Sequence, residues 1–383
     1  MRIEPFQLER WMTTYETQVR YDIAESGILP LTTADLLGFE PPATRADVMT
    51  HITGMQLGYS EARGSLELRT LLAETYQNCT PDNILVTTGA IEANFLLFHM
   101  LLNPGDHIIA PYPAYQQLYS VPRAIGCDVS MWRLRPEKQF CYDLAELETM
   151  VTPRTRLIVV NSPHNPTGAM LTAEEFQRIY QLADSVGAYV LSDEAYRWLE
   201  VPGGTPFAPP MYNMGPLGLS VGTLSKPFGL PGLRIGWIAG PAELVQACWG
   251  MRDYVTLSPG KINDALAVLA LKHRERVFER NRAIIAANLE CATRWIEQHS
   301  TVVSWLPPRG GLLALLRYSF AMPSYELANR LAEQYSVMLA PGAAFGFENY
   351  LRIGIGQEPA IFAEGLARTS QCFADLEVGS PGD

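Results

Sequence analysis

Short apolar runs alternate with amphipathic segments through the middle of the chain. The apolar runs are four to seven residues long and rich in β-branched residues, which predicts strands, and each segment between them has helical spacing. The predicted strands are 84–87, 107–110, 129–134, 157–161, 188–192, 217–222 and 235–239, and the predicted helices are 91–102, 115–125, 144–151 and 172–186. Strands that alternate with helices predict an α/β fold, a three-layer α/β/α domain around a mostly parallel (mixed) sheet.

The flanking regions have different patterns. Helices are predicted at 8–21 and at 65–76, with Ser65 as a possible cap, and Thr172 and Glu175 have capping-box spacing. A long helical pattern over 262–299, interrupted once, leads into short strands (312–316, 351–355) and helices (325–335, 359–372). We therefore predict a large domain at 46–260 and a smaller α+β domain formed by 1–45 and 261–383, joined by the long helix, with fraying over 378–383.

Composition narrows the class of protein. The 383 residues are 48% hydrophobic and 18% charged, with a net charge of -11. This acidity disfavours nonspecific binding to nucleic acid and to anionic membranes. The six cysteines form no CxxC pair, the first residues lack an apolar signal core, and the apolar runs are shorter than a membrane span. A soluble cytoplasmic protein without a structural metal is expected.

Polar side chains cluster directly after the predicted strands. In open parallel sheets, ligands bind beyond the carboxyl ends of the strands. Lysine is rare, since only Lys138, Lys226, Lys261 and Lys272 occur among the 29 basic residues. Lys226 follows a buried-looking strand and stands among glycines and hydroxyls. Taken alone, a surface loop with an incidental lysine explains it as well as a functional site does.

The other strand ends supply complementary groups. The helix start at Gly89, Ala90 and Ile91 suits a phosphate, to which Thr223, Ser225 and Arg234 could add donors. Asp193 follows an apolar run, so its carboxylate needs a cationic partner such as a protonated ring nitrogen. Gly89 could instead merely turn the chain, Arg234 could pair on the surface, and Asp193 could cap a loop. Together these groups meet the needs of one cofactor, pyridoxal 5'-phosphate.

From Tyr59 to Arg352 the chain resembles the class I/II aminotransferases, which are pyridoxal-phosphate enzymes of fold type I. The resemblance lies in Thr-Leu-Ser-Lys…Gly-Leu-Pro-Gly-Leu-Arg-Ile-Gly at 223–236, Asp-Glu-Ala-Tyr at 193–196 and Ser-Pro-His-Asn-Pro-Thr-Gly at 162–168. It implies an aspartate-aminotransferase-like fold and a Schiff base between Lys226 and the cofactor.

The same resemblance assigns roles to individual residues. The phosphate would be held by Arg234, Thr223, Ser225 and the amides after Gly89 (Ala90, Ile91), and the ring nitrogen by Asp193. The phenolic oxygen would be bound by Tyr196 and Asn165, and Tyr115 would stack on the ring. Tyr59 would reach the neighbouring subunit's phosphate, which implies a homodimer with shared sites. Arg352 would clamp the substrate α-carboxylate, with Asn165 beside it.

A departure from the family pattern leaves the reaction open. The family usually has a Gly-x-Pro-type segment in its amino-terminal loop, and here Ser26-Gly27-Ile28 stands instead, so Gly27 is a candidate substrate contact. For transfer of an amino group from an L-amino acid to a 2-oxo acid, Lys226 would be the base, with its pKa lowered by desolvation and nearby cations. The alternatives are a lyase or cyclase of the capreomycidine-synthase-like branch, which cyclises a hydroxylated arginine, and, more remotely, a non-catalytic regulator.

Overall fold

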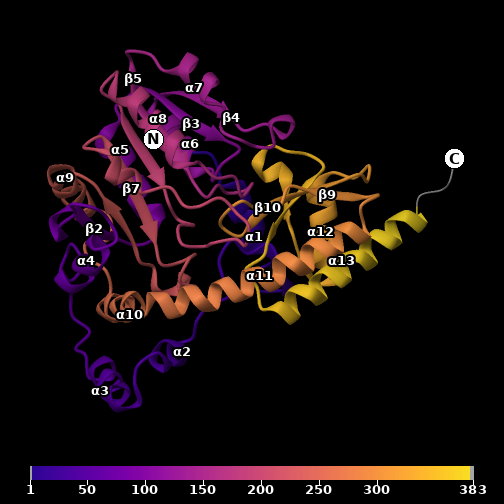
Figure 1. The fold of residues 1–383 in the computed structure, drawn as a ribbon, viewed down its shortest axis with the longest axis horizontal. Helices are drawn as coiled ribbons and strands as arrows, with labels where there is room; N and C mark the ends of the chain where they lie inside the picture. Colours follow the sequence, from indigo (N-terminus) through magenta and orange to yellow (C-terminus); the bar gives the residue numbers. More distant parts are fainter. Residues whose placement is uncertain (1, 380–383) are drawn as a thin grey trace.

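A seven-stranded sheet forms the centre of the larger part of the protein. The computed structural model describes residues 2–379 (Figure 1). The strand order is β2-β8-β7-β6-β5-β3-β4. β8 runs antiparallel to β2 and β7, and the remaining pairs are parallel, so the prediction of a mostly parallel, mixed sheet is confirmed. The strands are β2 (Ile84–Thr87), β3 (His107–Tyr112), β4 (Asp128–Arg133), β5 (Thr155–Asn161), β6 (Tyr189–Asp193), β7 (Gly218–Thr223) and β8 (Gly236–Ala239).

Helices cover both faces of this sheet because successive strand residues point to opposite sides. In β5, Leu157 and Val159 pack with α5, α6 and α9, whereas Ile158 and Val160 pack with α7 and α8. Near β2 and β8, helices α4 and α10 cover the face of the sheet opposite to α5 and α9. The helices are α4 (Leu66–Ala73), α5 (Ala90–Leu101), α6 (Gln117–Ile125), α7 (Leu144–Met150), α8 (Ala173–Asp184), α9 (Ala242–Arg252) and α10 (Lys261–Lys272). The three layers are those the sequence predicts.

The second part of the protein combines both ends of the chain. The long helix breaks once, at His273, between α10 and α11, as predicted. Figure 1 shows α11 leading from α10 to α12 and α13. An antiparallel sheet of order β12-β13-β10-β9 lies here, and β1 pairs in parallel with β11. The elements are α1 (Gln7–Tyr15), β1 (Tyr21–Asp22), α11 (Arg274–Gln298), β9 (Val303–Trp305), β10 (Leu313–Tyr318), α12 (Ser324–Tyr335), β11 (Val337–Met338), β12 (Ala340–Pro341), β13 (Tyr350–Gly354) and α13 (Pro359–Gly379).

The structure differs from the predicted elements near the amino terminus. The helix expected over 8–21 ends at Tyr15, because Tyr21 and Asp22 instead pair with Val337 and Met338. Two helices were not predicted, α2 (Thr33–Gly38) and α3 (Pro42–Thr53). α3, described over its whole length, buries none of its residues and stands away from the body in Figure 1. It therefore lacks the apolar stripe from which a helix is recognised in a sequence.

Short 3₁₀ turns complete the described chain: η1 (Pro81–Asn83), η2 (Pro136–Lys138), η3 (Met211–Met214), η4 (Pro231–Leu233) and η5 (Gly342–Phe345). Both predicted caps are present, since Ser65 accepts from the amide of Leu68 and Thr172 forms a capping box with Glu175. Fraying was predicted over 378–383; residues 378 and 379 belong to α13, which ends at Gly379, and 380–383 lie outside the described residues. Over residues 2–379, no helix has the length and apolar character to cross a membrane.

Candidate active site

A cavity of about 390 Å³ opens at the carboxyl ends of β5, β6 and β7. Asn161, Asp193 and Thr223 are the last residues of these three strands, so a parallel sheet brings them to one edge. The predicted site residues that line the cavity are Ala90, Ile91, Tyr115, Asn165, Asp193, Tyr196, Thr223, Ser225, Lys226, Arg234 and Arg352. Gly89 and Gly27 adjoin it through their neighbours, and Tyr59 lies elsewhere.

The start of α5 and the 223–234 segment form one polar cup. Gly89 has a φ of +78°, and a Cβ added there would lie 2.6 Å from Nη2 of Arg234. The hydroxyl of Thr223 donates to that of Ser225 over 3.0 Å. Free backbone N–H groups at the beginning of a helix, a guanidinium and two hydroxyls together suit a phosphate dianion. The close approach of Gly89 to Arg234 leaves room for the ligand only because position 89 has no side chain.

Asp193 lies at the base of the cavity and is only 5% exposed. Its carboxylate accepts from the side-chain amide of Asn94 (2.9 Å) and from the amide of Ala195 (3.1 Å). Burial raises the pKa of Asp193, and these two hydrogen bonds oppose the shift. A protonated ring nitrogen would compensate the buried charge, so the carboxylate fits the pyridine nitrogen of the cofactor.

Arg352 approaches the cavity from β13 and is 1% exposed. Nη1 donates to Oδ1 of Asn165 (3.2 Å) and Nη2 to the carbonyl of Ala24 (2.8 Å). Nε is buried and has no hydrogen-bond partner among residues 2–379. An unpaired guanidinium N–H in the wall of a cavity calls for an acceptor, and a substrate carboxylate would supply one.

The two predicted tyrosines enter the cavity from different elements. Tyr196 follows β6, is buried and is hydrogen-bonded to Ser26. Tyr115 precedes α6, and its ring centroid lies 4.8 Å from that of Phe6. Its hydroxyl donates to Glu9 over 3.3 Å. The amino-terminal segment thus covers the ring that was predicted to stack on the cofactor.

Lys226 meets an acidic partner that the sequence analysis missed. Its Nζ donates to Oγ of Ser26 (2.7 Å) and lies 3.3 Å from Oε1 of Glu25. Burial alone would lower the pKa of Lys226, but the charge of Glu25, helped by Tyr196, raises it in total. The predicted lowering of this pKa is therefore wrong for the chain by itself, because the nearest ion is a carboxylate and not a cation.

Other polar residues of the cavity were also missed. Asn94 and Asn161 hold Asp193 and Asn165 in place. Glu9, from α1, and Glu16, the residue after its end, also line the cavity. A polar side chain among the many apolar residues of helix α5 was a usable signal for Asn94. Glu25 directly precedes the Ser26-Gly27 departure already noted.

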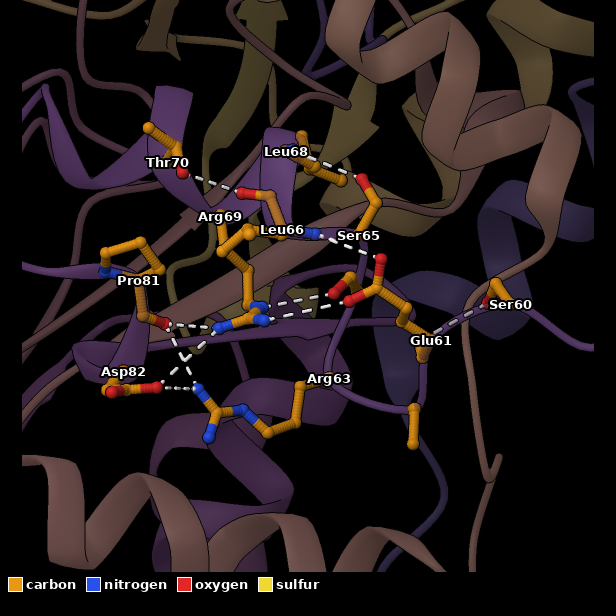
Figure 2. Close-up of polar contacts among 12 residues, drawn as sticks. Ser60, Glu61, Arg63, Ser65, Leu66, Leu68, Arg69, Thr70, Pro81 and Asp82 are labelled. Carbon is orange, nitrogen blue, oxygen red and sulfur yellow. Dashed lines mark hydrogen bonds and ion pairs between the residues drawn. The ribbon is translucent and has the colours of Figure 1, made fainter.

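Tyr59 is 82% exposed and lies away from the cavity. The chain that follows it is firmly held (Figure 2). Arg63 donates to Asp82 over 2.7 Å, and Arg69 donates to the carbonyl of Pro81 over 2.8 Å. The tyrosine therefore projects from an anchored segment into solvent.

Comparison with known proteins identifies the family. The model of the aminotransferase class I and II family matches residues 26–367. Capreomycidine synthase from Streptomyces vinaceus is 32% identical over 95% of this chain and 92% of its own length.

Two solved structures superpose over nearly the whole chain. A PLP-dependent aminotransferase from Streptococcus suis has a TM-score of 0.93 at 32% identity, with 100% of both chains covered. The PLP-dependent cyclase OrfR has a TM-score of 0.89 at 31% identity, with 98% of both covered. With pyridoxal phosphate as its cofactor and an aspartate-aminotransferase-like fold, the chain belongs to the class I and II aminotransferases.

Proposed function

We propose that this enzyme transfers an amino group between an L-amino acid and a 2-oxo acid, with Lys226 as cofactor anchor and base. The observation that carries the proposal is the meeting of Lys226, Asp193 and Arg352 in one cavity. The amine of Lys226 suits an aldehyde carbon, the carboxylate of Asp193 a protonated ring nitrogen, and the guanidinium of Arg352 an α-carboxylate.

Each group of the chain has a defined task in this proposal. Pyridoxal phosphate, when bound, supplies an electron sink for the negative charge that develops on the substrate Cα. Arg352 would orient the substrate by binding the substrate's α-carboxylate. Nζ of Lys226 would take up the Cα proton and release it to the carbon on the other side of the substrate nitrogen. Asp193 keeps the ring nitrogen protonated, while Asn165 and Tyr196 donate to the phenolic oxygen.

The phosphate would be held by Arg234, the hydroxyls of Thr223 and Ser225, and the first amides of α5, at Ala90 and Ile91. Gly89 would allow the close approach. Tyr115 would cover one face of the ring. Gly27, whose amide donates to Glu25 over 2.8 Å, would shape the substrate side of the cavity through its neighbours.

A homodimer with shared sites is the second part of the proposal. Tyr59 is exposed on an anchored segment, and further large apolar side chains are exposed nearby in sequence or at the end of α9. These residues are Met49, Leu57, Leu66, Tyr254, Val255 and Leu257. Burial of such side chains favours association, and Tyr59 would then reach the phosphate of the partner. A cytoplasmic location is part of the same proposal.

Elimination or cyclisation is the alternative reaction. It is favoured by Glu25, an acid beside Lys226 in the loop that departs from the family pattern, and by the similarity to capreomycidine synthase and to a cyclase. The non-catalytic regulator has no such support.

The test is incubation of the cofactor-loaded protein with a panel of amino acids and 2-oxo acids, followed by separation of the products. A new 2-oxo acid with aminated cofactor means transfer. Ammonia or a cyclic product with unchanged cofactor means elimination or cyclisation. Lys226→Ala is the control. If no amino acid is changed by the wild-type protein, or if Lys226→Ala is equally active, the proposed function is wrong.

A further inference from the structure

Lys226 and Arg352 line one cavity but come from different sheets. Lys226 follows β7 of the seven-stranded sheet, whereas Arg352 lies in β13 of the four-stranded sheet, and over residues 2–379 the two sheets are not paired. In the proposed function the amine acts at the substrate Cα and the guanidinium binds the carboxylate on that same carbon. Their separation must be held closely, because a misplacement of about 1 Å can lower a rate about a hundredfold.

The long helix α11 holds the chain shortly after each of these two side chains (Figure 1). Nδ2 of Asn281 donates over 2.6 Å to the carbonyl of Pro227, the residue that follows the lysine. Nδ2 of Asn288 donates to the carbonyls of Ile355 (3.2 Å) and Gln357 (2.6 Å), just beyond the end of β13. Seven residues make two helical turns, so both asparagines lie on one face of α11, about 10 Å apart along its axis.

The two asparagines are not explained by the helix itself. Asn281 is 1% exposed and Asn288 is 0% exposed. Asparagine is a poor helix former, and a buried amide costs free energy unless it is hydrogen-bonded. Helix formation and core packing alone would therefore favour an apolar residue at both positions. What the asparagines add is a grip on two backbone segments that are distant in the sequence.

A second set of contacts joins the same segments. Nη2 of Arg280, the residue before the first asparagine, donates to the carbonyl of Leu29 over 2.9 Å. The amide of Leu29 donates to the carbonyl of Gly356 (2.7 Å), and the amide of Ile28 donates to the carbonyl of Lys226 (3.4 Å). Residues 28 and 29 thus lie between the chain at the lysine and the chain beyond β13, and α11 holds all three segments.

We propose that Asn281 and Asn288 are positioning residues that set the separation between Lys226 and Arg352. Asn281 acts on the amine through the carbonyl of Pro227, and Asn288 acts on the guanidinium through the chain that leaves β13. This inference rests on the proposed function, since it takes Lys226 as anchor and base and Arg352 as the carboxylate clamp. It holds for transfer and for elimination alike.

The first arm of the test is Asn281→Ala in the cofactor-loaded protein. The substrate is the amino acid of the panel that the wild type turns over with the highest kcat/KM. We expect kcat to fall about ten- to a hundredfold with KM within about threefold, because the base is displaced and the clamp is not. As a readout apart from turnover, the pH midpoint of the absorbance of covalently bound cofactor should move by about half a unit or more, because the surroundings of the amine change.

The second arm is Asn288→Ala, which should have the opposite pattern. We expect KM to rise about tenfold with kcat within about threefold, since the guanidinium is displaced and the base is not. An unreactive probe checks this without turnover. It is the carboxylic acid that has hydrogen in place of the α-amino group of the same substrate, and the cofactor absorbance reports its binding. Its Kd should rise about tenfold in Asn288→Ala and stay within about twofold in Asn281→Ala.

Ser370→Ala is the matched control on the same helix. Nε1 of Trp295, in α11, donates to Oγ of Ser370 over 2.8 Å, far along the chain from either asparagine. This variant should lower the free energy of unfolding and leave kcat, KM and the absorbance midpoint at the wild-type values. Where an alanine variant does not fold, the serine variant at that position replaces it, because its hydroxyl is one bond shorter than the amide it replaces.

Two results would overturn the inference while the proposed function stands. One is that both asparagine variants match Ser370→Ala in kcat, KM, absorbance midpoint and Kd of the unreactive acid. The other is that both variants change kcat and KM by the same factors, which would mean that α11 supports the cavity only as a whole. A wild-type protein that turns over no amino acid would overturn the proposed function itself and this inference with it.

Discussion

Gly89→Ala should weaken cofactor binding in addition to any loss of folding stability. Gly89 has a φ of +78°, and the added Cβ would lie 2.6 Å from Nη2 and 3.3 Å from Cζ of Arg234. The guanidinium is the far end of a flexible side chain, so it can swing away at little cost in stability. It would then no longer point at the proposed phosphate.

The loss of folding stability and the loss of cofactor affinity are similar in size, so a control variant has to separate them. A side chain at positive φ costs about 1–3 kcal/mol of folding stability. A lost charge-assisted hydrogen bond costs about 1.5–3 kcal/mol of binding, which raises the Kd for pyridoxal phosphate about ten- to a hundredfold. Gly105→Ala is the matched control, since Gly105 has a φ of +89° and nothing within 4 Å of the added Cβ. It should show the loss of stability without the loss of affinity.

The assay is equilibrium titration of each cofactor-free protein with pyridoxal phosphate, beside urea unfolding of the same preparations. If Gly89→Ala binds the cofactor within about twofold of Gly105→Ala, Arg234 and the start of α5 do not form the phosphate site.

Three further predictions follow from the cavity. The Lys226→Ala variant should lack the absorbance of covalently bound cofactor, and its turnover should fall at least about a thousandfold, because the same amine both anchors the cofactor and acts as the base. Turnover near that of the wild type would contradict this. Arg352→Gln should raise KM about ten- to a hundredfold in steady-state kinetics, since the cation that would bind the substrate carboxylate is lost; an unchanged KM would exclude the carboxylate clamp. Burial, then Glu25, raises the pKa of Asp22 to about 6. The protonated Asp22 carboxyl contributes stability fully below about pH 4, and this contribution is lost as the pH rises to 6 and the buried group becomes charged. Asp22→Asn removes this charge and should therefore stabilise the cofactor-free chain by about 1–3 kcal/mol at pH 7. Parallel stability profiles in urea unfolding at pH 4 and 7 would refute that expectation.

The sequence by itself determined the layers and most of the cavity. A strand buried on both faces must be apolar along its length, so β5 and β7 could be recognised in the sequence as apolar runs. The residues at their carboxyl ends are polar because they lie at the edge of the sheet where a ligand binds. Asp193 was found directly after the run at 188–192, and Thr223 and Lys226 were found in the segment that follows the run at 217–222. The single break at His273 was likewise a local feature of helical spacing.

Only the tertiary structure decided which charges meet. Glu25 and Lys226 are 201 positions apart, and Asn94 and Asp193 are 99 apart. Periodicity reports which side of an element is buried, but not which distant element covers it. The fold brings the amino-terminal segment against the end of β7, and this contact reverses the expected shift in the pKa of Lys226. The sequence therefore determined where the anchor lies, and the packing of a remote loop decided its electrostatic environment, because Coulomb interactions depend on distance in space.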